Sequence, residues 1–200
     1  GNNRQSLFPS DADFRHYLVE LRRCLQDHAC QLLTYVLMPN HVHLVLQDHE
    51  AALSRFMQVL NARYTRYVNQ RYHRVGHLYQ GRFYAKWVDH DAYLLEVTRY
   101  VHLNPVRAHL VTRPEDYVWS SYRAYIGLEH PDQRFVNPQP IWSLMGGEGA
   151  RQPSRYRDFI QVMTPEQLST WESRLRRMGL IGSTRFARQM SDTAPAATSV

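Results

Sequence analysis

The stretch of sequence that decides the fold is Leu37-Met38-Pro39-Asn40-His41-Val42-His43-Leu44-Val45-Leu46. A proline and an asparagine separate two mainly apolar runs, residues 31–37 and 41–47. Apolar runs of this length on either side of a turn sequence predict two strands that form a hairpin. We expect a tight turn at residues 38–40, and we expect the hairpin to lie in the middle of a sheet.

Two histidines open the second predicted strand. Because successive side chains of a strand point to opposite faces, His41 and His43 share one face. The apolar side chains of residues 42, 44 and 46 share the other face, which we expect to pack on helices. Imidazoles at this spacing are close enough to chelate one divalent ion. The alternative for so short a motif is a chance pair of histidines on a polar strand face.

A tyrosine and an asparagine, Tyr100 and Asn104, lie on a helix predicted from about residue 91 to residue 104, with Asp89 or Asp91 as its cap. Pro105 disfavours helical geometry at the residue before it, so we expect this helix to stop at Asn104 and a short second helix to follow over 105–110. At 100° per residue, the Tyr100 and Asn104 side chains are one turn apart and point the same way. The alternative is a half-buried tyrosine beside an asparagine C-cap. The buried stripe of the helix should consist of Leu94, Val97 and Val101.

These two motifs together favour phosphodiester chemistry. In-line cleavage needs a nucleophile, a metal that polarises the nonbridging oxygens, and stabilisation of the leaving oxygen. A tyrosine becomes a nucleophile when its phenol loses a proton, which a nearby divalent ion assists. Two neutral imidazoles and an amide oxygen suit Mg²⁺ or Mn²⁺ better than a closed structural zinc site. The hypothesis is an enzyme that cuts single-stranded DNA and keeps one end covalently attached.

The charge of the chain agrees with a polyanionic partner. It has 24 lysine and arginine residues against 18 acidic ones, a formal charge of +6 and a pI of about 9.5. Lys86 is the single lysine, and arginine is suited to binding phosphates and stacking on bases. The alternative for the arginines of a long helix predicted at about 51–71 is a solvated face. The candidate DNA contacts are Arg55, Arg63, Arg66, Arg74, Tyr79, Arg82 and Arg107.

Length and composition bound the class of protein. Two hundred residues, 44% of them hydrophobic, are enough for one large domain with its own core. Cys24 and Cys30 form no CxxC motif, so we expect no disulfide scaffold and a reducing compartment. No apolar run approaches the ~18 residues of a membrane span, and no signal peptide is recognisable. We expect a cytoplasmic, nucleoid-associated protein without a membrane partner, as a monomer or homodimer.

Helical spacing and turn residues predict the remaining elements of the N-terminal part. A helix is expected from Asp11 to about Asp27, capped by Asp11 or Asp13. A loop rich in glycine, arginine and aromatic residues should span 72–82, and a strand should follow at about 83–88.

The C-terminal part should contain short helical or irregular pieces at 119–126, a loop-like segment at 127–140, and helices within about 155–189 (163–177, then 183–190). We therefore divide the chain into a domain of residues 1–126, a helical C-terminal extension of 127–190 and a disordered tail of 191–200.

Three segments resemble one known family. They are MPNHVHLVL at 38–46, RYVHLNPVRA at 99–108 and the opening GNNRQ at 1–5. In this order, with a long helix between the first two, they are similar to the REP-associated tyrosine transposases, which belong to the single-tyrosine HUH transposases. The resemblance covers about residues 1–126, and GLIGSTRF at 179–186 is similar to a C-terminal extension of some members.

The resemblance implies a role for each motif residue. His41 and His43 would be the metal-binding pair, Tyr100 the nucleophile that becomes a 5′-phosphotyrosine, and Asn104 the third ligand. Related enzymes often carry glutamine at that last position, and asparagine has a shorter reach. The implied fold is α+β, with a ferredoxin-like antiparallel sheet packed with helices and a strand before GNNRQ. The implied substrate is a single-stranded palindromic hairpin with a tetranucleotide beside its foot.

Two other classes of function compete with a transposase. A domesticated, noncatalytic hairpin DNA-binding protein would keep the arginines and aromatic residues that stack on single strands. A metal-dependent hydrolase unrelated to DNA would need an acidic general base near the histidines. The nearest acids, Asp48 and Glu50, lie beyond the end of the predicted strand, which ranks the hydrolase last.

Overall fold

The computed structural model describes residues 6–79, 81, 83–85, 87–88, 92–130, 135–146, 149–161, 166–167, 169–170, 173 and 180–181. Its elements are, in order, α1 (Asp11–Asp27), β1 (Cys30–Met38), β2 (His41–Asp48), α2 (Leu53–Arg71), β3 (Trp87–Val88), α3 (Ala92–Arg107), η1 (Pro114–Asp116), α4 (Tyr122–Tyr125), α5 (Gln139–Leu144), η3 (Gly149–Arg151), α6 (Gln152–Gln161) and β4 (Leu180–Ile181).

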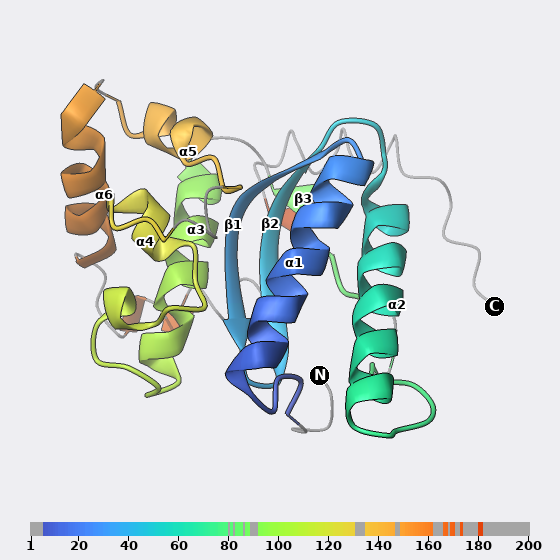
Figure 1. Cartoon of the computed structure of the whole chain (residues 1–200). Helices are drawn as coiled ribbons and strands as arrows, with labels where there is room; N and C mark the ends of the chain where they lie inside the picture. The colour runs from blue at the N-terminus through green and yellow to red at the C-terminus, as the bar shows by residue number, and fades with distance from the viewer. Residues whose placement is uncertain are drawn as a thin grey trace.

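The β1–β2 hairpin lies between two helical layers (Figure 1). Helices α1 and α2 pack on one side, and α3 packs on the other side with α4, α5 and α6 beyond it. Nearly every residue of β1 is buried, as expected for a strand covered on both faces. The α+β fold expected from the sequence is confirmed.

Strand β1 is hydrogen-bonded along both edges. It pairs antiparallel with β2 in a register that places Met38 opposite His41 and Val36 opposite His43. On its other edge, Leu37 N–H donates to the Trp119 carbonyl (2.9 Å), and Ser121 N–H donates to the Tyr35 carbonyl (3.1 Å). The predicted hairpin is therefore confirmed, with a two-residue turn. Its expected place in the middle of a sheet is not: among the described residues β1 and β2 form a sheet of two strands, and the segment around Ser120 adds only an isolated bridge to β1.

Helix α1 is held at its start by a buried carboxylate. The cap is Ser10, not Asp11 or Asp13 as the sequence predicted. Asp13 sits one turn inside, with no exposed surface, and accepts hydrogen bonds from the Ser10 backbone and hydroxyl (2.7 Å each). The Tyr67 and Tyr72 hydroxyls also donate to it, at 3.0 and 2.6 Å. Asp13 therefore ties α1 to the end of α2.

Helix α3 corrects the expectation that Pro105 stops the helix at Asn104. It runs through Pro105 to Arg107 as one element, with no second helix over 105–110. Proline removes one N–H from the last turn, but the Ala108 N–H closes the next turn on the Asn104 carbonyl (2.9 Å). Because Pro105 is buried near the C-terminal end, it costs the helix one hydrogen bond without breaking it.

The predicted strand at 83–88 was too long. Of its described residues, Trp87–Val88 form a strand, β3, and 83–85 have no regular structure. Its parallel partner is β4, Leu180–Ile181, which lies between the two helices predicted over 163–177 and 183–190. A two-residue strand is set by a partner more than ninety residues away, so local spacing carries little signal for it.

The C-terminal part contains two described α-helices, α5 and α6. Helix α6 begins at Gln152, slightly earlier than predicted, and α5 forms within the expected loop-like segment 127–140 and beyond it. Of the helix predicted over 163–177, residues 166–167, 169–170 and 173 are helical. The helix predicted over 183–190 and the tail 191–200 lie outside the described residues.

Cys24 and Cys30 are buried free thiols. Within the part of the chain that the structure describes, no helix has the length and apolar character needed to span a bilayer.

The Asp13 cluster leads to a stability prediction. Asp13→Ala leaves two tyrosine hydroxyls and the Ser10 amide without their acceptor, so the free energy of unfolding should fall by about 3 kcal/mol. Urea denaturation at neutral pH measures the change. The exposed Asp11 is the matched control, and Asp11→Ala should cost less than about 1 kcal/mol.

The Asp13 contribution should also depend on pH. Burial raises the pKa of Asp13. The hydrogen bonds from Tyr72, Ser10 and Tyr67 together lower it by more than burial raises it, so the net pKa lies below the ordinary 3.8. The stabilisation is therefore fully present above about pH 4 and is lost as the pH falls through the folded-state pKa. The gap between wild type and Asp13→Ala should narrow in acid, and a gap that widens in acid would contradict this assignment.

Candidate active site between the hairpin and α3

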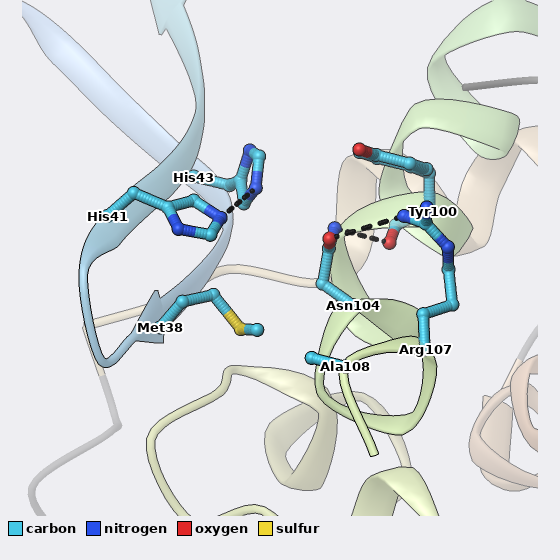
Figure 2. A pocket seen from close by; sticks show the side chains of 7 residues that line it. All are labelled: Met38, His41, His43, Tyr100, Asn104, Arg107 and Ala108. Carbon is cyan, nitrogen blue, oxygen red and sulfur yellow. Dashed lines mark hydrogen bonds between the residues drawn. The ribbon is translucent and has the colours of Figure 1, made fainter. Parts of the chain in front are cut away.

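A pocket of about 340 Å³ opens between the end of the hairpin and the last two turns of α3. The hairpin contributes Met38 and the two histidines, and α3 contributes the tyrosine and asparagine singled out from the sequence (Figure 2). The full lining is Met38, His41, His43, Tyr100, Asn104, Arg107 and Ala108. The fold thus brings together both sequence motifs, which lie almost sixty residues apart.

The two imidazoles converge on one point. The Nε2 atoms of His41 and His43 are 3.1 Å apart, and their rings are nearly perpendicular. Asn40 Oδ1 lies 2.7 Å from His41 Nδ1. Since the amide oxygen can only accept, Nδ1 carries the proton and Nε2 presents its lone pair to the pocket. This contact of Asn40 was missed from the sequence, although the residue directly precedes His41.

Both imidazoles are held neutral. Burial lowers the pKa of His41. Burial, and then the nearby charges of His41 and Arg107, lower the pKa of His43 to about 4. A neutral imidazole is the form that binds a metal ion.

Tyr100 faces the histidine pair from α3. Its ring centroid is 5.9 Å from that of His43, with the rings nearly perpendicular. Figure 2 shows the phenol oxygen turned from α3 towards the hairpin. The geometric expectation, Tyr100 on a helix over the histidine face, is confirmed within a single chain. Its role in chemistry remains a prediction.

Asn104 lies one turn after Tyr100 and is buried. Its Nδ2 donates to the Tyr100 carbonyl (2.9 Å), which leaves Oδ1 as the group that can accept from Arg107 Nη1 (3.4 Å) or ligate an ion. Asn104 is not a C-cap, because α3 continues beyond it to Arg107.

The residues present fit a divalent ion with open coordination positions. Two adjacent ligands of an octahedral ion with bonds of about 2.1 Å are about 3 Å apart, which matches the measured Nε2 separation. Among the residues that the structure describes, no group of three or more His, Cys, Asp or Glu side chains could hold a metal. A third protein ligand would therefore be an amide oxygen, and Asn104 Oδ1 is the one that lines the pocket.

Asp48, the first acidic residue after the histidines in the sequence, binds the start of α2. The Asp48 carboxylate accepts hydrogen bonds from the backbone N–H groups of Ala52 (2.8 Å) and Leu53 (3.1 Å) at the start of α2. No acidic side chain is part of the pocket lining in the described structure. This arrangement offers no general base of the kind that an unrelated metal hydrolase would need.

The other predicted DNA contacts lie outside the pocket. Arg55, Arg66 and Arg74 are exposed, on α2 and just after it. Arg63 pairs instead with Asp27 of α1 (3.0 Å). Tyr79 is half-buried, and Arg82 lies outside the described residues. Of the predicted DNA contacts that the structure describes, Arg107 alone lines the pocket with the motif residues.

Sequence reasoning missed the residue that positions α3. His102 is completely buried, two residues after Tyr100. Its Nε2 lies 2.8 Å from Ser121 Oγ, and its Nδ1 lies 2.6 Å from the Tyr156 hydroxyl. Ser121 Oγ already donates to the Tyr35 carbonyl, so it accepts from His102 Nε2–H, and Nδ1 accepts from Tyr156. Burial lowers the pKa of His102 to about 3, which keeps it neutral.

The α+β fold thus places paired histidines on a strand opposite a tyrosine on a facing helix. The chain belongs to the IS200-like transposase family, whose sequence model, described as "Transposase IS200 like", matches residues 1–104. The resemblance inferred from the motifs is thereby confirmed.

One solved structure shares the fold. It is a REP-associated tyrosine transposase bound to a REP hairpin, with a TM-score of 0.53 and 19% sequence identity. The similarity covers 66% of this chain and 78% of that one. At this identity the likeness is one of fold. No curated protein sequence matches the chain.

The hydrogen bond between Tyr156 and His102 generates a second stability prediction. Tyr156→Phe leaves a buried imidazole nitrogen without a donor and should lower the free energy of unfolding by about 1–3 kcal/mol. Tyr79→Phe is the matched control, because the buried Tyr79 hydroxyl has no hydrogen-bond partner among the described residues. Chemical denaturation should find the control neutral or slightly stabilised, and equal losses in both variants would contradict the assignment.

Proposed function

We propose that this protein is a metal-dependent single-stranded DNA endonuclease and transposase that acts through a 5′-phosphotyrosine on Tyr100. The observation that carries the proposal is the 5.9 Å approach of the Tyr100 and His43 rings in one pocket, in a chain of the IS200-like transposase family. His41, His43 and Asn104 are the proposed ligands of a Mg²⁺ or Mn²⁺ ion. When bound, the ion would neutralise charge on the nonbridging phosphate oxygens.

The proposed reaction is an in-line displacement. The Tyr100 oxygen, after its proton passes to solvent, forms a bond to phosphorus as the bond from phosphorus to the 3′ oxygen breaks. The electron pair leaves on the 3′ oxygen, which takes up a proton to become a 3′ hydroxyl. The 5′ end of the strand stays on Tyr100, and a new 3′ hydroxyl can reverse the step to join a different strand.

The proposed substrate is a palindromic hairpin in single-stranded DNA. Support comes from the charge of +6 and from the similar fold of the transposase that was solved on a REP hairpin. Arg55, Arg66 and Arg74 are exposed and are proposed phosphate contacts. To bind a phosphate, Arg55 would exchange its hydrogen bond to Gln58 (2.9 Å), and Arg63 would have to leave Asp27. We also propose that the protein works in the nucleoid, as a monomer or homodimer.

A noncatalytic hairpin-binding protein is the second candidate. The observation in its favour is that the histidine pair has no third His, Cys, Asp or Glu beside it in the described structure. The two candidates differ in one outcome: only the enzyme leaves DNA covalently attached after denaturation.

Replacement of the proposed nucleophile tests the function directly. Tyr100→Phe removes the only atom able to bond to phosphorus, while the ring keeps its packing. Cleavage and covalent adduct should fall below detection on a denaturing gel, with hairpin affinity within about threefold of wild type. Tyr93→Phe is the control, because Tyr93 lies two turns earlier on α3 and does not line the pocket. Full activity in Tyr100→Phe would mean that a water molecule, and not the tyrosine, attacks.

Binding and cleavage should respond differently to chelation and salt. The basic surface supplies most of the affinity, so hairpin binding should survive EDTA while cleavage stops. If about five phosphates are contacted, affinity should fall about 100- to 500-fold between 50 and 200 mM salt. Fluorescence anisotropy measures the affinity in EDTA and at each salt concentration, and a denaturing gel measures cleavage. Equal affinity for the hairpin and for a random duplex would rule out hairpin recognition.

A further inference from the structure

Among the described arginines predicted to contact DNA, Arg107 is the one that lines the pocket. It lies at the end of α3, one turn after Asn104, and lines the pocket. Its guanidinium carbon is 5.1 Å from the centroid of the Tyr100 ring, and Nη1 is 3.4 Å from Asn104 Oδ1. Figure 2 shows the side chain running back along α3 towards Tyr100.

The helical phase explains this placement. Residues 100, 104 and 107 are spaced i, i+4 and i+7, so at 100° per residue they form one stripe. The stripe exists only because α3 continues through Pro105 to Arg107. If the helix ended at Asn104, helical geometry would not fix which way the Arg107 side chain points.

We propose that Arg107 is a catalytic residue that binds the scissile phosphate while Tyr100 attacks it and then holds the phosphotyrosine. This inference rests on the proposed function and deepens it. A guanidinium offers five N–H donors in a planar fork. One of them can remain on one lone pair of Asn104 Oδ1, which leaves the second lone pair for an ion, and the other donors of the fork can bind two nonbridging oxygens of one phosphate. Arg107 neither gains nor loses a proton in the step.

The reason to assign Arg107 to the reaction, and not to general affinity, is its distance from the nucleophile. Negative charge on the transferring phosphoryl group is largest in the transition state, where a fixed cation stabilises it most. A guanidinium that already lies over the Tyr100 ring needs little reorganisation to reach a phosphate bonded to that tyrosine. Arg99, on the same helix, instead pairs with Glu96 and donates to the Phe159 carbonyl (3.1 Å) on the α6 side.

The test separates binding from chemistry in Arg107→Ala and Arg107→Lys. Hairpin affinity is measured by anisotropy in EDTA, and the single-turnover cleavage rate is measured with Mn²⁺ at saturating protein. Arg107→Ala should lose about 100- to 1,000-fold in the saturated rate and less than about threefold in affinity. Arg107→Lys should retain more of the rate than Arg107→Ala, because lysine keeps the positive charge. Its rate should stay below that of wild type, because lysine lacks the planar fork of donors.

Added guanidinium ion provides a readout that a structural role would not move. Millimolar guanidinium should restore part of the Arg107→Ala rate and none of the Tyr100→Phe rate. Arg113→Ala is the control, since Arg113 is exposed, pairs with Asp116 (2.8 Å) and does not line the pocket; its rate should equal that of wild type.

The outcomes are distinguishable. If wild type forms an adduct and Arg107→Ala keeps its saturated rate within about threefold, or loses only affinity, the role of Arg107 is wrong and the proposed function stands. A lost rate that guanidinium does not restore also overturns this role, because the defect is then structural. If wild type forms no adduct, the proposed function fails, and this inference fails with it.

Discussion

The position of α3 against the hairpin depends on one buried imidazole. His102 meets Ser121 beside β1 and Tyr156 on α6, and it has no exposed surface. An unpaired polar group at such depth costs free energy, so both partners of His102 must be in place together. Tyr100 lies two residues earlier on the same helix. The contacts of His102 therefore set the rotation of α3 that turns Tyr100 towards His43.

The C-terminal helix takes part in this arrangement. Tyr156 of α6 donates to His102, and Arg99 of α3 donates to the Phe159 carbonyl and stacks on the Phe159 ring at 4.1 Å. The division into a domain of 1–126 and an extension of 127–190 describes the sequence, but α6 supplies part of the support behind the site helix. Helix α6 lies on the opposite side of α3 from the hairpin (Figure 1), so it supports the site helix from behind and does not line the pocket.

The sequence predicted the hairpin, the two long helices and the meeting of His41, His43 and Tyr100, because alternation and helical phase are local rules. It did not predict that α3 passes through Pro105, since the preference of the residue before proline is weak compared with burial of the last turn. The predicted cap of α1 was also wrong. Asp13 lies inside the helix, where it accepts hydrogen bonds from two tyrosines more than fifty residues away. Likewise, nothing local to Arg63 reveals that it pairs with Asp27.

The most direct measurement of the central claim is the identity of the residue that carries DNA after cleavage. Trypsin cuts after Arg99 and Arg107, so it releases residues 100–107 as a peptide with a single tyrosine, separate from the peptide that contains Tyr93. Wild-type protein would be incubated with hairpin DNA and Mn²⁺, digested with nuclease and trypsin, and analysed by tandem mass spectrometry. We predict a 5′-linked nucleotide on Tyr100. A nucleotide on another residue, or cleaved DNA with free 5′ phosphates and no modified peptide, would contradict the account.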